Sequence, residues 1–278
     1  MILSACGGSA VNKPAALLNA ESYTNEGLQA FAEDDSSKAQ QLFSRALILY
    51  QGMDNQHGML LSHINLAEVT LALNEYPASL KNLDAATYIV KKTSLADIQS
   101  RITLLYSVLA LKQNKTTLAE SIVQPLLPKF NKEAPVISPN NLQLVAIAHR
   151  TKIAFVQNQD KLLWTQRYAE MLKKSFIKNN ALEARLLRFQ SALLIDQGDY
   201  QGAESNFQQA LLKYKSIPSR AGIAVTLFEL GELAVIEKRW QDARDYFNRA
   251  INVYRYLKDF DKVAQLMEWL VLHSLNNP

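Results

Sequence analysis

Residues 198–210 read GDYQGAESNFQQA. Within this stretch Ala203, Phe207 and Ala210 are spaced four and then three residues apart, so they share one face of an α-helix. The same face recurs elsewhere in the chain, as Ala39, Phe43 and Ala46 and again as Ala243, Phe247 and Ala250. The last of these faces begins forty residues after Ala203. A helical face that returns at a fixed distance indicates an internal repeat.

A small residue lies twelve positions before the first member of each face. The six such residues are Gly27, Ala67, Ser107, Thr151, Ser191 and Gly231, with spacings of 40, 40, 44, 40 and 40 residues. A small side chain on one helix lets its hairpin partner approach closely, and the aromatic side chain then packs against the next unit. Turn-forming residues separate the two helices of each unit, and no segment alternates apolar and polar residues as a strand does. Six helix hairpins are therefore predicted.

The fourth unit fits the pattern least well. The positions of its second-helix face hold Leu163, Arg167 and Glu170, two of which carry a charge. A register shifted by one residue would instead turn Trp164 and Tyr168 inward. The spacing to the fifth unit supports a hairpin here, and both registers remain open.

The pattern resembles the tetratricopeptide repeat, in a variety of about 40 residues. The best matches to it are Gly27/Ala39/Phe43/Ala46, Ala67/Tyr76/Ser79/Leu83/Ala86, Ser191/Gly198/Tyr200/Ala203/Phe207/Ala210 and Gly231/Trp240/Ala243/Phe247/Ala250. The resemblance covers about residues 15–256 and implies an all-α, right-handed superhelical solenoid of six hairpins. One more amphipathic helix at 259–275 is expected to cap the last hydrophobic face.

Four prolines divide the expected array. Pro125, Pro128, Pro135 and Pro139 should end the second helix of repeat three near Gln124, because proline blocks helix continuation. A surface loop and a hinge both remain open for this linker. The expected layout is a signal remnant and tether at 1–14 and an array at 15–276, made of repeats 1–3 at 15–124, the linker at 125–140, repeats 4–6 at 141–257 and the cap.

The amino terminus carries a second resemblance. Residues 3–6 read LSAC, similar to the lipobox of bacterial lipoproteins, in which the cysteine thiol accepts a diacylglycerol. Only five residues precede Cys6, too few for an export signal, so we expect the true start upstream or a segment cut short. The resemblance implies a lipid-anchored envelope protein, and Gly7 after the cysteine is similar to outer-membrane lipoproteins facing the periplasm. The alternative is an accidental match in a cytoplasmic, peptide-sensing regulatory module.

Composition excludes several classes of function. The chain has 278 residues, a formal charge of +4 with mixed signs, and a single cysteine, which forbids an intrachain disulfide. No pair of its four histidines has metal-ligand spacing, and no phosphate loop, nucleophile elbow or dinucleotide fingerprint occurs. The sequence therefore predicts no enzyme, catalytic residue, metal or cofactor, and no nucleic-acid partner.

Binding is better supported than catalysis. The resemblance implies that the first helices of the repeats line a concave groove that takes a protein or peptide. Asn25 and Asn65 lie forty residues apart in one equivalent position, where the family's asparagine often hydrogen-bonds a peptide backbone. Helical spacing also directs cations toward the groove, namely Arg101, His149, Lys152, Arg185 and Arg188. This basic middle suits an acidic segment or a C-terminal carboxylate, partly offset by acidic neighbours; ordinary solvated positions remain the alternative.

Overall fold

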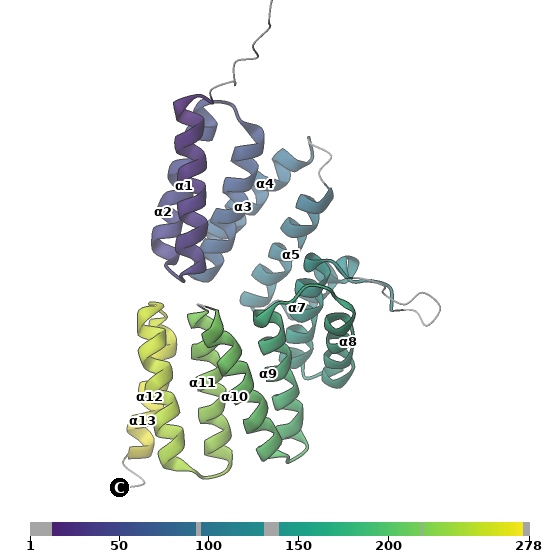
Figure 1. Ribbon diagram of the computed structural model, residues 1–278, viewed down its shortest axis with the longest axis vertical. Coiled ribbons are helices and arrows are strands. Elements are labelled where there is room, and N and C mark those ends of the chain that lie inside the picture. Colours follow the sequence, from purple (N-terminus) through teal and green to yellow (C-terminus); the bar gives the residue numbers. More distant parts are fainter. Residues whose placement is uncertain (1–12, 93–95, 131–138, 218, 275–278) are drawn as a thin grey trace, which may run out of the picture.

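The computed structural model describes residues 13–92, 96–130, 139–217 and 219–274, so Cys6 lies outside it (Figure 1). In these ranges thirteen α-helices and one 3-10 helix follow one another without a strand, which confirms the predicted all-α solenoid. The elements are α1 (Ala15–Ala32), α2 (Ser36–Gly52), α3 (Gln56–Ala72), α4 (Tyr76–Val90), α5 (Ala96–Lys112), α6 (Thr116–Val123), η1 (Gln124–Leu126), α7 (Asn141–Gln157), α8 (Lys161–Lys174), α9 (Asn180–Asp196), α10 (Tyr200–Ser216), α11 (Arg220–Ile236), α12 (Trp240–Tyr256) and α13 (Phe260–Ser274).

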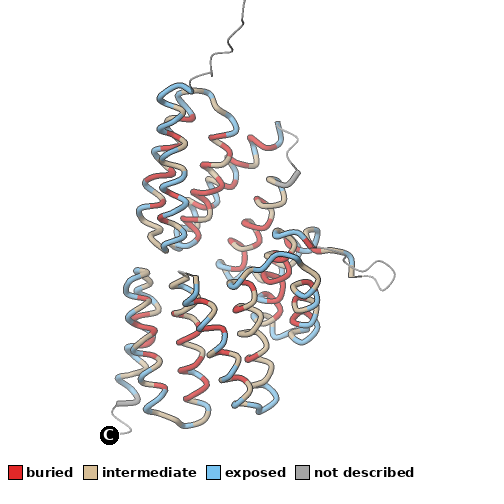
Figure 2. Tube along the Cα trace, viewed as in Figure 1, coloured by how far each residue is buried: buried red, intermediate tan, exposed pale blue. Residues whose placement is uncertain are grey.

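The helices pack as consecutive hairpins. Each odd-numbered helix from α1 to α11 pairs with the helix that follows it, and the second helix of a hairpin packs on the first helix of the next. The first helices α3, α5, α7, α9 and α11 also contact one another in sequence. Buried residues lie along the inner faces of the hairpins (Figure 2). The first helices therefore line one continuous side of a curved array.

The six small positions do what the repeat pattern predicts. A Cβ atom added to Gly231 would lie 2.3 Å from the Phe247 ring, and one added to Gly27 would lie 2.6 Å from Phe43. Where the small residue is serine, its hydroxyl also joins the two helices. Ser191 Oγ, for example, donates a 3.0 Å hydrogen bond to the backbone carbonyl of Ala203. Close approach at the glycines and this bond at the serines hold the two helices of a hairpin in one register.

In repeat four the shifted register is the observed one. Trp164 and Tyr168 are buried, whereas Leu163 is 42% exposed, so a face built on Leu163, Arg167 and Glu170 is wrong. Repeat four has one residue more between its small position and its second helix, ten from Thr151 to Lys161 against nine from Ser191 to Tyr200, and the turn before α8 holds two left-handed residues, Asn158 and Asp160. The extra residue rotates α8 by about 100° relative to a twelve-residue spacing.

The proline-rich segment ends the second helix of repeat three as predicted. α6 stops at Val123, and the 3-10 turn η1 contains Pro125. One hydrophobic core nevertheless runs from Leu104 on α5 to Leu182 on α9, across this segment. Whether the linker acts as a hinge stays a prediction.

The two ends of the array touch each other. The backbone N–H of Arg220 donates a 2.6 Å hydrogen bond to Asp34 Oδ2, and its guanidinium donates to the carbonyl of Glu33. The same guanidinium lies 4.5 Å from the ring centroid of Tyr256. Figure 1 shows the α1–α2 hairpin end to end with α11 and α12. The first hairpin and the last, α11–α12, are thus joined across 186 residues of sequence.

Helix α13 packs on α12 and covers the end of the array. Leu266 is buried there, and Trp269 meets Phe247 edge to face at 4.6 Å between ring centroids. Among the described residues, no helix is long and apolar enough to cross a membrane.

Candidate functional site

The residues predicted to line the groove lie on five of the first helices. Asn25 is exposed on α1, and no hydrogen bond or ion pair joins its side chain to another described residue. The other six are distributed as Asn65 on α3, Arg101 on α5, His149 and Lys152 on α7, and Arg185 and Arg188 on α9. The charges among them divide into cations that have acidic partners and cations that do not.

Arg101 has partners on the preceding repeat. Its guanidinium donates to both carboxylate oxygens of Glu68, at 3.2 and 2.8 Å, and to Asn65 Oδ1 at 3.3 Å. Asn65 is consequently 6% exposed and engaged, while Asn25, its equivalent on α1, is not. This end of the groove carries little unpaired charge.

The charge of Arg188 is also paired, in this case with a carboxylate of the following repeat. Its Nε and Nη2 atoms both donate at 2.6 Å to the two carboxylate oxygens of Glu229 on α11. The bidentate pair is about four-fifths buried, and the carboxylate holds the pKa of Arg188 above its ordinary value against the cost of burial. Arg188 therefore ties α9 to α11.

His149 contributes no positive charge at neutral pH. The side chain is 6% exposed, and its Nε2 lies 3.0 Å from Ser107 Oγ on α5. Burial lowers the pKa of His149 to about 4, and the nearby charges of Lys152 and Arg185 add to this effect. The imidazole is a neutral hydrogen-bonding link between two first helices.

Lys152 and Arg185 are the cations left over. In the part of the chain that the structure describes, no hydrogen bond or ion pair is formed by either side chain. Solvent reaches Lys152, yet the surrounding helices displace much of the water around its ammonium group and lower its pKa to about 8. Repulsion from Arg185, Lys112 and Arg188 adds to this shift. Lys112, Lys152 and Arg185 are called the basic centre below.

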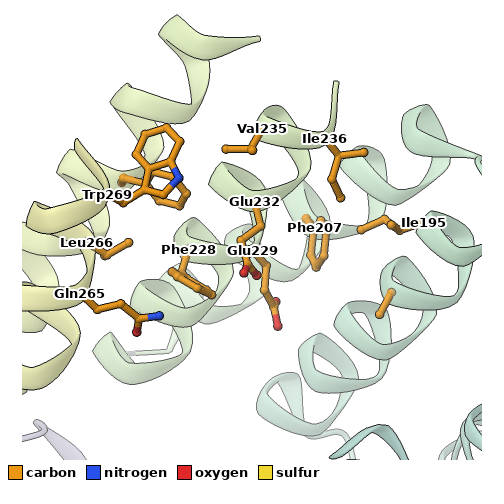
Figure 3. A pocket seen from close by; sticks show the side chains of 12 residues that line it. Ile195, Phe207, Phe228, Glu229, Glu232, Val235, Ile236, Gln265, Leu266 and Trp269 are labelled. Carbon is orange, nitrogen blue, oxygen red and sulfur yellow. The ribbon is translucent and has the colours of Figure 1, made fainter. Parts of the chain in front are cut away.

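A pocket at the end of the array was not predicted from the sequence. It has a volume of about 540 Å³ and lies between α9, α11 and α13, with walls from α10 and α12. Its lining is mostly apolar, with Phe228, Leu266 and Trp269 around one side and Ile195 and Phe207 around another (Figure 3). This C-terminal pocket forms because α13 folds back over α11 and α12. Phe228 is the one signal for this pocket in the sequence, because it lies three residues before the small position Gly231 and therefore on the same side of α11 as the groove.

Two carboxylates project into the C-terminal pocket from α11. Glu229 is held by Arg188, whereas Glu232, one turn later, forms no hydrogen bond or ion pair with another described residue. Solvent reaches the Glu232 side chain, but the surrounding helices displace part of the water around its carboxylate and raise its pKa to about 7; the charge of Glu229 raises this pKa further, and Lys262 on α13 lowers it. No three His, Cys, Asp or Glu side chains of the described residues gather where a metal could bind.

Comparisons with known proteins agree with this geometry. Residues 182–255 match the family model of the tetratricopeptide repeat. The crystal structure of PilW, a widely conserved type IV pilus biogenesis factor, superposes with a TM-score of 0.50 at 12% identity, over 89% of this chain and 98% of PilW. The apo form of RapI superposes with a TM-score of 0.52 at 14% identity, over 92% of this chain and 73% of RapI. No curated protein sequence matches the chain. These likenesses show a solenoid of the tetratricopeptide type.

Proposed function

We propose that the protein is a non-enzymatic binding scaffold whose groove captures an acidic segment, or a C-terminal carboxylate, of a protein partner. The observation that carries the proposal is the basic centre. On either side of it Arg101 and Arg188 are neutralised by Glu68 and Glu229, while Lys152 and Arg185 are not. Charges left unpaired on one stretch of a concave face favour an anionic ligand.

The energetics of the basic centre favour ligand binding over self-contained stability. Arg185 and Lys112 both repel Lys152, and desolvation already lowers the pKa of Lys152. A carboxylate placed between them would relieve this repulsion and form charge-assisted hydrogen bonds. Nearby, His149 and Asn65 are engaged within the protein, so their part is to position the groove; Asn25 remains available for a peptide backbone.

We propose further that Cys6 is acylated and that the groove faces the periplasm from the outer membrane. The support is the LSAC sequence at residues 3–6. Several acyl chains together, at about 0.8 kcal/mol for each buried methylene, anchor a protein firmly. Pilus, secretion or cell-wall assembly is the setting we propose to test first, by analogy with PilW, with which the chain shares a fold. The alternative is a cytoplasmic peptide-sensing module.

Selection from a random peptide library tests the binding proposal. The library should display free C termini and be selected with the full chain at low salt. We expect enrichment of acidic residues or C-terminal carboxylates, lost in Lys152→Gln/Arg185→Gln and retained in Lys81→Gln, an exposed lysine on α4. Arg188 is left intact, because its removal would leave Glu229 buried and unpaired. Acidic enrichment that survives the double substitution would remove the basic centre from the account.

Metabolic labelling with an alkyne fatty acid tests the anchor. The complete gene should be expressed in a bacterium, beside a Cys6→Ser variant. Label on the wild type alone, with the protein in the outer-membrane fraction, is expected. Unlabelled protein in the cytosol would replace the envelope proposal with the cytoplasmic one and leave the groove proposal standing.

A further inference from the structure

The C-terminal pocket combines apolar walls with a carboxylate, Glu232, that no cation of the described residues hydrogen-bonds. Its walls are apolar, and a volume of about 540 Å³ is in the range of small-ligand sites. Glu232 adds a carboxylate to this lining and is open to solvent (Figure 3). An acidic group beside apolar walls favours a ligand that carries a positive charge. The pocket thus calls for an apolar group and a positive charge.

The protein itself supplies that cation only in part. Lys262 is the cation on α13 that acts on Glu232, but its Nζ donates to Gln265 Oε1 at 3.0 Å and lies 5.2 Å from the Phe228 ring centroid. Arg188, on α9, is committed to both oxygens of Glu229. Among the described residues, Glu232 is the pocket carboxylate without a hydrogen-bonded cation.

The pocket and the basic centre belong to one groove. The Arg188–Glu229 pair lies between them, because the charge of Arg188 lowers the pKa of Lys152 and the charge of Glu229 raises the pKa of Glu232. α7, α9 and α11 are consecutive first helices, each in contact with the next. Neighbouring helices pack about 8–10 Å apart, so the two sites are separated by about 20 Å, the length of roughly six extended residues.

We propose that the C-terminal pocket binds a large apolar side chain followed by lysine or arginine, with the apolar group against Phe228 and Trp269 and the cation on Glu232. This rests on the proposed function, since the pair belongs to the same partner segment whose acidic end occupies the basic centre, about six residues away. Apolar contact supplies affinity, and the two opposite charges fix the direction in which the segment lies.

The same peptide selection tests this proposal when it is repeated with pocket variants of the full chain. Glu232→Gln removes the charge but keeps the shape, and Ala192→Phe places a ring in the pocket. We expect wild-type selectants to carry the apolar–basic pair. Glu232→Gln should lower the enrichment of the basic residue at least tenfold and spare the apolar one, and Ala192→Phe should remove the apolar preference. Glu170→Gln, at an exposed position of α8 outside the pocket, is the control.

The outcomes separate the two proposals. Loss of acidic enrichment in Lys152→Gln/Arg185→Gln, with the apolar–basic pair retained, supports both. An apolar–basic pair selected without any acidic preference upholds the pocket and overturns the basic centre. Selectants without the pair, or a basic preference unchanged in Glu232→Gln, overturn the pocket proposal. Circular dichroism of each variant confirms that the array is folded.

Discussion

Repeats four and five solve the same packing problem with different sequences. In repeat five Ser191 and Ala203 are twelve residues apart, and the Ser191 hydroxyl bonds the Ala203 carbonyl. In repeat four the equivalent bond runs from Thr151 Oγ1 to the carbonyl of Trp164, at 3.2 Å and thirteen residues away. What the two repeats share is the contact between their helices. The number of residues between the bonded positions differs, thirteen in repeat four and twelve in repeat five, because the chain that joins the two helices differs in length.

The two repeats also differ in what they bury. The core of repeats five and six is aliphatic and aromatic, built on residues such as Phe207 and Phe247. Around repeat four, His149 is buried against Ser107, and Arg150 is buried with an ion pair to Glu120 and its guanidinium 4.3 Å from the Trp164 ring centroid. The irregular repeat is also the one that presents Lys152. The irregular repeat thus carries the middle residue of the basic centre, while Lys112 and Arg185 lie on the repeats before and after it.

Deleting one turn residue should have the largest effect where the repeat is regular. Without Gly198, helix α10 would rotate by about 100° and bring Glu204 and Gln208 to the core positions of Ala203 and Phe207. We expect a loss of at least about 4 kcal/mol, through lost burial and buried polar groups. Hydrogen exchange of the α9–α12 amides measures it.

The matched deletion in repeat four should be tolerated. Removing Gln159 restores a twelve-residue spacing from Thr151 to Trp164 and leaves Asp160 just before α8, where Asp199 stands before α10. The stability should change by less than about 1 kcal/mol. Equal damage from the two deletions would contradict the view that repeat four conserves contacts rather than spacing.

A methyl group at a small position should cost less than a register shift. Gly231→Ala would place a Cβ atom 2.3 Å from the Phe247 ring, whereas Gly52→Ala meets nothing within 4 Å. We expect Gly231→Ala to lower the free energy of unfolding by about 2 kcal/mol and Gly52→Ala to leave it unchanged or slightly raised. Urea titration followed by circular dichroism compares them, and equal stabilities would remove the close-approach argument.

His149 should make the irregular region sensitive to acid. Its folded-state pKa is lowered to about 4 from an ordinary 6.5, so between these values the unfolded state takes up a proton that the folded state does not. Stability should therefore fall by roughly 2 kcal/mol from pH 7.5 to pH 5 through this group. In His149→Gln this loss should be absent, and an identical pH dependence in both proteins would place the histidine in water.

Much of the architecture was predictable from sequence, because a small residue and an aromatic face recur at fixed distances. Repeat four escaped that rule because one extra residue lies between Thr151 and the start of α8, where asparagine and aspartate adopt left-handed conformations. Trp164 and Tyr168 were the signal, since large aromatic residues seldom lie fully exposed on a helix.

For the binding surface, the sequence predicts which side of each first helix lines the groove but not which of its charges are paired. The pairing of Arg101 with Glu68 and of Arg188 with Glu229 depends on how successive first helices are staggered, over 33 and 41 residues of sequence. The spacing of residues within one helix gives no information about how neighbouring helices are staggered. The C-terminal pocket depends in the same way on where α13 docks.

The most direct test of the central claim is the pH dependence of binding of an acidic peptide, chosen by the selection described above, to Lys152→Arg and to the wild type. Displacement of water by the surrounding helices and repulsion from neighbouring cations lower the pKa of Lys152 to about 8, so above this pH the free protein loses a charge that the bound carboxylate requires. Wild-type affinity should fall about tenfold from pH 7 to pH 9, and that of Lys152→Arg should stay nearly constant. An equal response of both proteins to pH would contradict the placement of the ligand's negative charge at Lys152.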